Sequence, residues 1–252
     1  MAERVAFISD IHANLEALEA VLADIDERET GETLCLGDVV GYGIDAEACI
    51  DLVQRHARIC LCGNHDWAAV NSALGFNTTA RRAIEYTQAR LKPGRLSGKA
   101  SRRRWAFLEN LPNEHRIDDW LLVHGSPRDP VMEYIFPEDV DIAPEKVEEI
   151  FGLVQRVCFV GHTHLPGVFT EDLVFRTPAE LSGSYYLGQE KAVVNVGSVG
   201  QPRDGDPRAC YAIVGEDTVT WRRVDYDVQK TMEKIRSSPL DNLGAERLAL
   251  GK

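Results

Sequence analysis

The sequence has no apolar run long enough to cross a membrane, and this absence excludes one broad class of protein. None of its hydrophobic stretches approaches the roughly 18 residues that a transmembrane helix requires. The first ten residues, MAERVAFISD, also lack the long apolar segment and the small-residue cleavage site of a signal peptide. We therefore expect a cytoplasmic protein that has no membrane partner.

The cysteines follow no metal-binding or redox spacing. All six are scattered, most of them within apolar runs where a reduced thiol packs as a small hydrophobic group. Cys60 and Cys62 alternate along a predicted strand and have no CxxC partner, which argues against a zinc knuckle or a redox pair. Reduced thiols agree with a cytosolic compartment.

Positive charge is scarce as well. The formal net charge is −12 and the pI is near 5.1, and a mainly acidic surface repels the phosphates of a nucleic acid. We therefore expect no nucleic-acid polymer as a partner, and the oligomeric state stays open. An anionic substrate would need local positive charge where it binds.

The order of the predicted elements indicates an α/β fold. Residues 5–66 alternate short apolar strands with helices, and residues from about 67 to 112 are mostly compatible with helix. Short strands follow, a Gly-Glu-Asp turn within 210–226 predicts a hairpin, and a helix over 227–236 precedes a polar tail with little anchoring. We expect one domain over residues 1–252 with a helical excursion at about 67–112. The strand-helix half would form one sheet and the strand-rich half much of a second, with helices outside.

Side chains that can bind metals follow five of the predicted strands. Taken singly, acidic, amide or histidine residues at such positions more often cap helices, form turns or support structure. Here they end five separate strands, each beside a glycine or serine that lets the backbone turn sharply. The residues are Asp10, His12, Asp38, Asn64, His124, His162 and His164. We interpret the whole set as a metal site.

The mixture of ligand types indicates which metals would bind. Carboxylate and amide oxygens combined with neutral imidazole suit borderline divalent ions such as Mn, Fe, Zn, Co or Ni. Seven ligands are too many for one catalytic ion with an open coordination position, but they suit two ions about 3.5–4 Å apart that share a carboxylate. We therefore expect two divalent metal ions as cofactors, with Mn the most suitable in an assay. The cations would also attract a phosphate group.

Five sequence blocks, taken in order, resemble the calcineurin-like metallophosphoesterases. The blocks are D-x-H (Asp10, His12), G-D (Gly37, Asp38), G-N-H-D (Gly63, Asn64, His65, Asp66), a strand-end histidine (His124) and G-H-x-H (Gly161, His162, His164). They span residues 10–164, and the strand-rich remainder suits that family's four-layer αββα sandwich. The resemblance thus implies two packed mixed β-sheets flanked by helices.

The resemblance also implies a role for each residue of the set. Asp10, His12 and His164 would bind one metal, Asn64, His124 and His162 would bind the other, and Asp38 would bridge the two. His65 would hydrogen-bond a phosphate oxygen or protonate the leaving group, and Asp66 would orient His65. A metal-bridging hydroxide would attack phosphorus in line.

One block departs from the pattern of two known branches of the family. It reads GDVVGYG rather than GDYVDRG, so it lacks the arginine that clamps a substrate phosphate in protein Ser/Thr phosphatases and symmetrical dinucleoside tetraphosphatases. Tyr42 lies in that neighbourhood instead. The departure favours the smaller bacterial and archaeal phosphodiesterase-like branch.

Two segments could supply the missing positive charge. The stretch Asn195 to Asp206 resembles the N-P-G-S loop of that branch; it is either a strand with a Gly-rich turn or a functional loop whose Arg203 faces substrate phosphate. The arginines of the helical excursion are either a solvated helix face or an overhang that selects substrates with more than one phosphate. They are Arg81, Arg82, Arg102, Arg103 and Arg104. Trp67, Phe76 and Asn77 could contact a base or serve packing.

We predict a dinuclear metal-dependent phosphoesterase that hydrolyses a small phosphate ester, with a phosphodiester as the favoured substrate. A phosphoprotein phosphatase and a dinucleoside polyphosphate hydrolase are the enzymatic alternatives. A non-catalytic metal-binding interaction scaffold is the alternative from another class. Such scaffolds typically lack part of the ligand set or the histidine at position 65, and both are present here.

Overall fold

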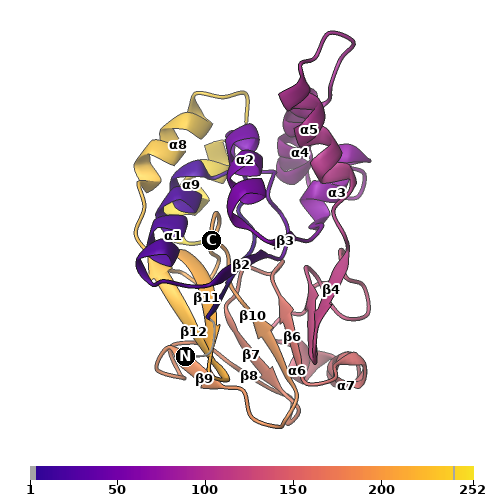
Figure 1. The fold of residues 1–252 in the computed structure, drawn as a ribbon, viewed down its shortest axis with the longest axis vertical. Coiled ribbons are helices and arrows are strands. Elements are labelled where there is room, and N and C mark those ends of the chain that lie inside the picture. The colour runs from indigo at the N-terminus through magenta and orange to yellow at the C-terminus, as the bar shows by residue number, and fades with distance from the viewer. Residues whose placement is uncertain (1–3, 241) are drawn as a thin grey trace.

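Two six-stranded mixed sheets form the centre of the molecule (Figure 1). The structure is a computed structural model that describes residues 4–240 and 242–252. Residues 1–3 and 241 of the predicted domain lie outside this part of the chain. The first sheet has the order β3 (Ile59–Cys60), β2 (Glu32–Cys35), β1 (Val5–Ile8), β11 (Ala209–Gly215), β12 (Thr218–Val224) and β9 (Ser184–Tyr186). The second has the order β4 (Glu114–Ile117), β5 (Trp120–Val123), β6 (Val157–Val160), β10 (Ala192–Asn195), β7 (Gly167–Thr170) and β8 (Val174–Arg176).

Alternating side chains let both faces of the central strands pack. Phe7 of β1 points between the sheets, where its ring stacks on Phe159 of β6 with 4.2 Å between centroids. Its neighbours Ala6 and Ile8 point to the opposite face, toward helices. Because these strands are buried on both faces, their sequences are continuous apolar runs.

Helices flank the two sheets; in Figure 1 most of them lie above the strands, and α6 and α7 lie at the lower right. They are α1 (Leu15–Glu27), α2 (Ala46–His56), α3 (Asn64–Val70), α4 (Thr78–Leu91), α5 (Lys99–Glu109), α6 (Asp139–Ile142), α7 (Pro144–Leu153), α8 (Val228–Arg236) and α9 (Asn242–Leu250). α1 and α2 pack on the outer face of the first sheet, and α7 packs on the outer face of the second. In the described part of the chain, no helix is both long and apolar enough to cross a bilayer. The layers confirm the predicted αββα sandwich.

The strands are divided between the sheets differently from the expectation. β9, β11 and β12 come from the strand-rich half but complete the first sheet, because β11 pairs antiparallel with β1, with Ala6 opposite Ile213. The predicted hairpin is confirmed between β11 and β12. Its two turn residues, Glu216 and Asp217, both have positive φ, as a tight two-residue hairpin turn requires. A fully apolar strand such as β11 fits the centre of either sheet, so sequence alone could not assign it.

The C-terminal tail is anchored, contrary to the expectation. α9 buries Ala245 and Leu248 against Met232 and Ile235 of α8, and α8 in turn packs on α1. Two buried apolar positions are too few for a helical pattern to stand out in the sequence. β4, α6 and α7 were likewise not predicted. The α8–α9 pair places the end of the chain beside the loops that follow β1, β2 and β10, at the carboxyl ends of these strands.

Leu248→Ala should therefore lower the free energy of unfolding by about 2–3 kcal/mol, because it leaves a cavity between α8 and α9. Leu250→Ala is the matched control, since that side chain is 55% exposed and its loss should cost less than about 0.5 kcal/mol. Urea denaturation followed by circular dichroism measures both. Equal losses in the two variants would show that α9 does not pack as described.

Candidate metal centre

The candidate site lies where parallel strands of both sheets end. β1, β2 and β3 are parallel neighbours in the first sheet, and β5, β6 and β10 are parallel neighbours in the second. Backbone hydrogen bonds join the loops at their carboxyl ends. The N–H of Asp10 donates to the carbonyl of Gly37 (3.0 Å), and the N–H of Gly200 donates to the carbonyl of Asp10 (2.9 Å). Residues far apart in the chain are thereby brought to one place.

Most of the predicted ligands have a left-handed backbone. The φ angles are 53° at Asp10, 50° at His12, 52° at Asp38, 68° at His162 and 62° at His164. This conformation is unfavourable for residues other than glycine, by about 1–3 kcal/mol each, and persists only where the surrounding structure enforces it. The chain consequently turns at each of these residues, so side chains two positions apart need not point the same way.

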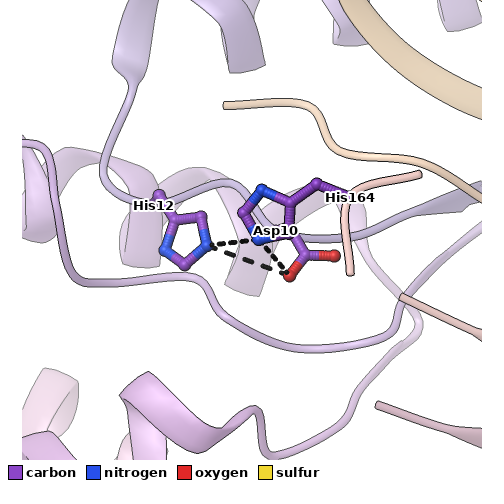
Figure 2. Close-up of side chains that lie close together, drawn as sticks. All are labelled: Asp10, His12 and His164. Atoms are coloured by element: carbon purple, nitrogen blue, oxygen red, sulfur yellow. Dashed lines mark hydrogen bonds and ion pairs between the residues drawn. The ribbon is translucent and has the colours of Figure 1, made fainter. Parts of the chain in front are cut away.

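Asp10, His12 and His164 form the first group of side chains (Figure 2). Nε2 of His12 lies 3.1 Å from Nε2 of His164. Oδ1 of Asp10 lies 3.2 Å from Nε2 of His164 and 3.8 Å from Nε2 of His12. All three residues are buried, and Oδ1 of Asp10 accepts no hydrogen bond from the described residues. Three lone-pair donors thus face one another.

Asp38, Asn64, His124 and His162 form the second group. Nε2 of His124 lies 3.1 Å from Nδ1 of His162 and 3.3 Å from Oδ1 of Asn64. Oδ2 of Asp38 lies 3.4 Å from Nε2 of His124 and 3.6 Å from Nε2 of His12. This single carboxylate oxygen therefore lies between the two groups, and His162 and His164 belong to different groups.

The other oxygen of Asp38 is held by the loop after β3. Oδ1 accepts a hydrogen bond from the backbone N–H of His65 at 2.8 Å. A Cβ at Gly63 would collide with this carboxylate and with the backbone nitrogen of Asp38, so only glycine fits there. Glycine is therefore required sterically at this position of the G-N-H-D block, because any side chain would displace the carboxylate of Asp38.

Each of the four imidazoles pairs its outer nitrogen with a backbone carbonyl. The pairs are Nδ1 of His12 with Val40 (3.2 Å), Nδ1 of His124 with Leu36 (3.1 Å), Nε2 of His162 with Met132 (3.2 Å) and Nδ1 of His164 with Gln201 (2.5 Å). A carbonyl only accepts, so these nitrogens carry the proton and the inner nitrogens direct lone pairs into the site. Two lone pairs 3.1 Å apart repel unless a proton or a cation lies between them.

The electrostatics of the site favour positive charge. Burial alone would lower the pKa of His124, but the carboxylates of Asp38 and Asp10 raise it to about 9. Burial lowers the pKa of His162 to about 3 and that of His12 well below its usual value. Burial would raise the pKa of Asp38, but the facing imidazoles hold it well below its usual range. Ionised carboxylates and mostly neutral imidazoles are the states in which these groups bind metals, so the donor set fits divalent cations.

Comparison with known proteins identifies the family. Residues 4–218 match the model of the calcineurin-like phosphoesterase superfamily domain. The chain belongs to the calcineurin-like phosphoesterase superfamily. An uncharacterized protein of Methanocaldococcus jannaschii is similar to it over its length, with 37% identity across 260 residues that cover 98% of each chain.

Two solved structures resemble this phosphoesterase along the whole chain. A metallophosphoesterase from Sphaerobacter thermophilus is 39% identical, with a TM-score of 0.84 and complete coverage of both chains. A hypothetical protein from Pyrococcus horikoshii shares the fold at 20% identity, with a TM-score of 0.77 over 99% of this chain and 98% of that one. The family and fold expected from the five sequence blocks are confirmed.

His65 lies beside the first group of side chains in the candidate site. Its ring contacts those of His12 and Tyr42 at centroid distances of 4.8 and 4.6 Å, and Phe76 meets it edge-on at 5.3 Å. A Cβ at Gly41, which has a φ of 92°, would collide with the imidazole. Burial lowers the pKa of His65 to about 4, although Asp38 acts in the opposite direction. A neutral imidazole is thus held at the edge of the ligand set.

Asp66 does not contact His65 as expected. Its carboxylate accepts hydrogen bonds from the backbone N–H groups of Val39 (3.2 Å), Val40 (3.1 Å) and Gly63 (3.2 Å), whereas Nδ1 of His65 has no hydrogen-bond partner among the described residues. As the third residue of α3, Asp66 accepts from the amide that precedes the helix and from the loop after β2. It therefore joins the two loops that carry Asp38 and His65, and it makes no hydrogen bond to the imidazole itself.

Arg203 and Tyr134 lie over the site, and only the arginine was predicted. The Arg203 guanidinium lies 5.9 Å from the ring centroid of Tyr42, so this arginine occupies the neighbourhood where the G-D block lacks one. Tyr134 stacks on His162 with 3.6 Å between centroids, and Phe136 stacks on Tyr134 at 5.2 Å. Tyr134 follows His124 by ten residues in an irregular loop, where no local pattern marks it.

The loop after β10 supports the ligands through backbone contacts. Nδ2 of Asn195 donates to the carbonyl of Gly161 (2.7 Å), and the hydroxyl of Ser198 donates to the carbonyl of Asp10 (2.9 Å). In the helical excursion, Arg103 and Arg104 bind Asp51 of α2 instead of overhanging the site. Asn77 caps α4, because its side-chain oxygen accepts a hydrogen bond from the N–H of Ala80. Its observed role is therefore structural and not contact with a base.

Replacing Asp38 tests whether its carboxylate is shared. Asp38→Asn should lower Mn²⁺ content from about two ions per chain to less than about one, because it removes a charge that both groups face. Elemental analysis after equilibration with Mn²⁺ measures this. Asp26→Asn, an exposed position on α1, is the control with the same change of charge. Full loading of both sites in Asp38→Asn would refute the shared position.

Proposed function

We propose that this phosphoesterase binds two divalent cations and hydrolyses a small phosphodiester. The observation that carries the proposal is the convergence of four imidazole lone pairs and two buried carboxylates, with Oδ2 of Asp38 3.4 and 3.6 Å from nitrogens of the two groups. Membership of a phosphoesterase superfamily supports hydrolysis of phosphate esters. The substrate class and the number of ions are our inference.

The residues would divide between two ions as they are grouped in space. Asp10, His12 and His164 would hold one ion, and Asn64, His124 and His162 the other, with Asp38 shared. When bound, such a pair supplies a water of lowered pKa as nucleophile and neutralises charge that develops on the phosphoryl group. The carbonyl-bound outer nitrogens keep each imidazole in the tautomer that binds metal.

Two further side chains would act on the substrate itself. His65, held by Gly41 and Asp38, would donate an N–H hydrogen bond to a phosphate or leaving-group oxygen. A neutral imidazole favours hydrogen bonding over outright proton donation. Arg203 would pair with a phosphate oxygen and replace the arginine that the G-D block lacks. The exposed faces of Tyr134 and Phe136 would accept the organic part of the ester.

The other candidate functions have less support. A phosphoprotein phosphatase or a dinucleoside tetraphosphatase of the GDYVDRG type would have its phosphate-clamping arginine beside Asp38, where Tyr42 lies. A scaffold without catalysis would not need His65 to be held against the ligands by a glycine of positive φ. We therefore favour catalysis on a small diester.

Hydrolysis of p-nitrophenyl esters tests the proposed reaction. With Mn²⁺ present, the protein should cleave bis-p-nitrophenyl phosphate faster than p-nitrophenyl phosphate, and a chelator should abolish both rates. Absence of turnover on either ester while Mn²⁺ is demonstrably bound would favour the scaffold. A preference for the monoester would contradict the diesterase assignment.

His65→Ala should lower kcat by about 10²–10⁴-fold and leave Mn²⁺ content unchanged, because His65 acts on the substrate and not on the ions. Steady-state kinetics and elemental analysis on the same sample separate these effects. His56→Ala, at an exposed histidine that ends α2, should change neither quantity. Undiminished turnover in His65→Ala would show that this imidazole is not catalytic.

A further inference from the structure

A large groove lies where the chain passes from the second sheet to the first. β8 and β9 are edge strands of the two sheets, and most of the segment 177–183 between them lines the groove. Its volume is about 800 Å³, which is within the range of sites that hold a small organic molecule. The apolar part of the lining consists of Leu165, Pro166, Phe175, Pro178 and Trp221. The groove therefore offers mostly flat apolar side chains to a ligand.

One wall of this groove begins at the metal centre. Pro166 is two residues after His164, so their Cα atoms are at most about 7.6 Å apart. The next residue, Gly167, packs directly against the ring of Phe175, because a Cβ at this glycine would collide with that ring. A group attached to a phosphate beside His164 would therefore reach the groove.

A second wall leads from the other histidine of the G-H-x-H block. Tyr134 stacks on His162 with 3.6 Å between centroids, and Phe136 stacks on Tyr134 at 5.2 Å. The following residue, Pro137, lines the groove. The rings of Tyr134 and Phe136 are 36% and 42% exposed, so an apolar surface continues from the metal centre to the groove.

Trp221 is held by the residue that supports the same block. Its indole N–H donates to the carbonyl of Asn195 at 2.8 Å. Nδ2 of Asn195 in turn donates to the carbonyl of Gly161 (2.7 Å) and to the hydroxyl of Thr163 (2.8 Å), on either side of His162. Because the one polar atom of the Trp221 side chain is bonded within the protein, this residue offers only apolar atoms to the groove.

The basic side chains of the groove are paired with acidic ones. Arg223 binds Asp204, and Nη2 of Arg208 lies 2.7 Å from Oδ2 of Asp206. Glu138 adds a further carboxylate to the lining. A second phosphate would thus meet more acidic than basic groups in the groove, which favours a ligand without charge.

We propose that this groove binds the organic group of the substrate, and that this group is a neutral ring system about the size of a nucleoside. The proposal rests on the proposed function and narrows its substrate class. The phosphate of the ester would lie at the metal centre, and its ring would lie between the walls that begin at His162 and His164. Phe175, Pro166 and Trp221 would stabilise the ring by apolar burial and by contact between flat faces.

A matched pair of ligands tests the groove. Thymidine 5′-monophosphate and methyl phosphate each carry one phosphate, but only the first carries a nucleoside. Calorimetry with the Mn²⁺-loaded protein measures both affinities. Thymidine 5′-(p-nitrophenyl phosphate) and methyl p-nitrophenyl phosphate make the same comparison in turnover, because both release p-nitrophenolate.

The main variant fills the groove instead of removing part of the fold. Ala179 is exposed and lines the groove, so Ala179→Trp would place a ring where the ligand is expected. Ala106→Trp, at an exposed alanine of α5, is the matched control. Phe175→Leu removes an aromatic face but keeps an apolar side chain beside Phe169.

The wild type should bind thymidine 5′-monophosphate about tenfold more tightly than methyl phosphate, or better. Ala179→Trp should reduce this preference to less than about threefold and raise KM for the thymidine ester about tenfold. It should change Mn²⁺ content and the affinity for methyl phosphate by less than about twofold. Phe175→Leu should retain part of the preference, and Ala106→Trp all of it.

Two results would overturn the proposal for the groove. One is a wild type that binds the two ligands with equal affinity, and the other is an equal loss of both affinities in Ala179→Trp. Hydrolysis of both esters by the wild type would leave the proposed function intact in either case. If the wild type cleaves neither ester, the proposed function fails, and the binding comparison still decides whether the groove holds the ring.

Discussion

The central constraint in this phosphoesterase is that two buried carboxylates and four imidazole lone pairs face one another within a few ångströms. Burying such groups without partners is costly, so each needs compensation from its surroundings. Backbone amides hold the outer carboxylate oxygens, as the N–H of His65 does for Asp38 and the N–H of His162 does for Asp10. Backbone carbonyls hold the outer imidazole nitrogens. The inner carboxylate oxygens and the inner imidazole nitrogens have no such partners, and they point into the site, where cations would bind them.

This constraint explains features of the fold that would otherwise look unrelated. Parallel strands in the middle of each sheet bring their carboxyl ends together, and left-handed residues at those ends turn the side chains toward a common point. Asp66 joins two of the loops through backbone amides, and Ser198 joins a third. α9 adds a wall from the far end of the chain. The unfavourable backbone at Asp10, His12 and Asp38 persists because these contacts enforce it.

The sequence predicted those parts of the site that consist of side chains directly after strands. It indicated the ligand set and the fold class because apolar strands followed by polar, glycine-linked residues leave a local pattern. It could not show the backbone carbonyls of Leu36, Val40 and Gln201, since a carbonyl carries no sequence signature. It did not show that Asp66 binds the amides of Val39 and Val40, which are distant in sequence, as well as the nearby amide of Gly63. It missed Tyr134 because an irregular loop leaves no periodic pattern.

The division of the neighbouring histidines between two ions is the claim on which this account most depends. Anomalous diffraction at the manganese edge, from crystals grown with Mn²⁺, tests it most directly. The account predicts two peaks, one beside Asp10, His12 and His164 and the other beside Asn64, His124 and His162, with Asp38 between them. A single peak, or His162 and His164 on the same ion, would contradict it.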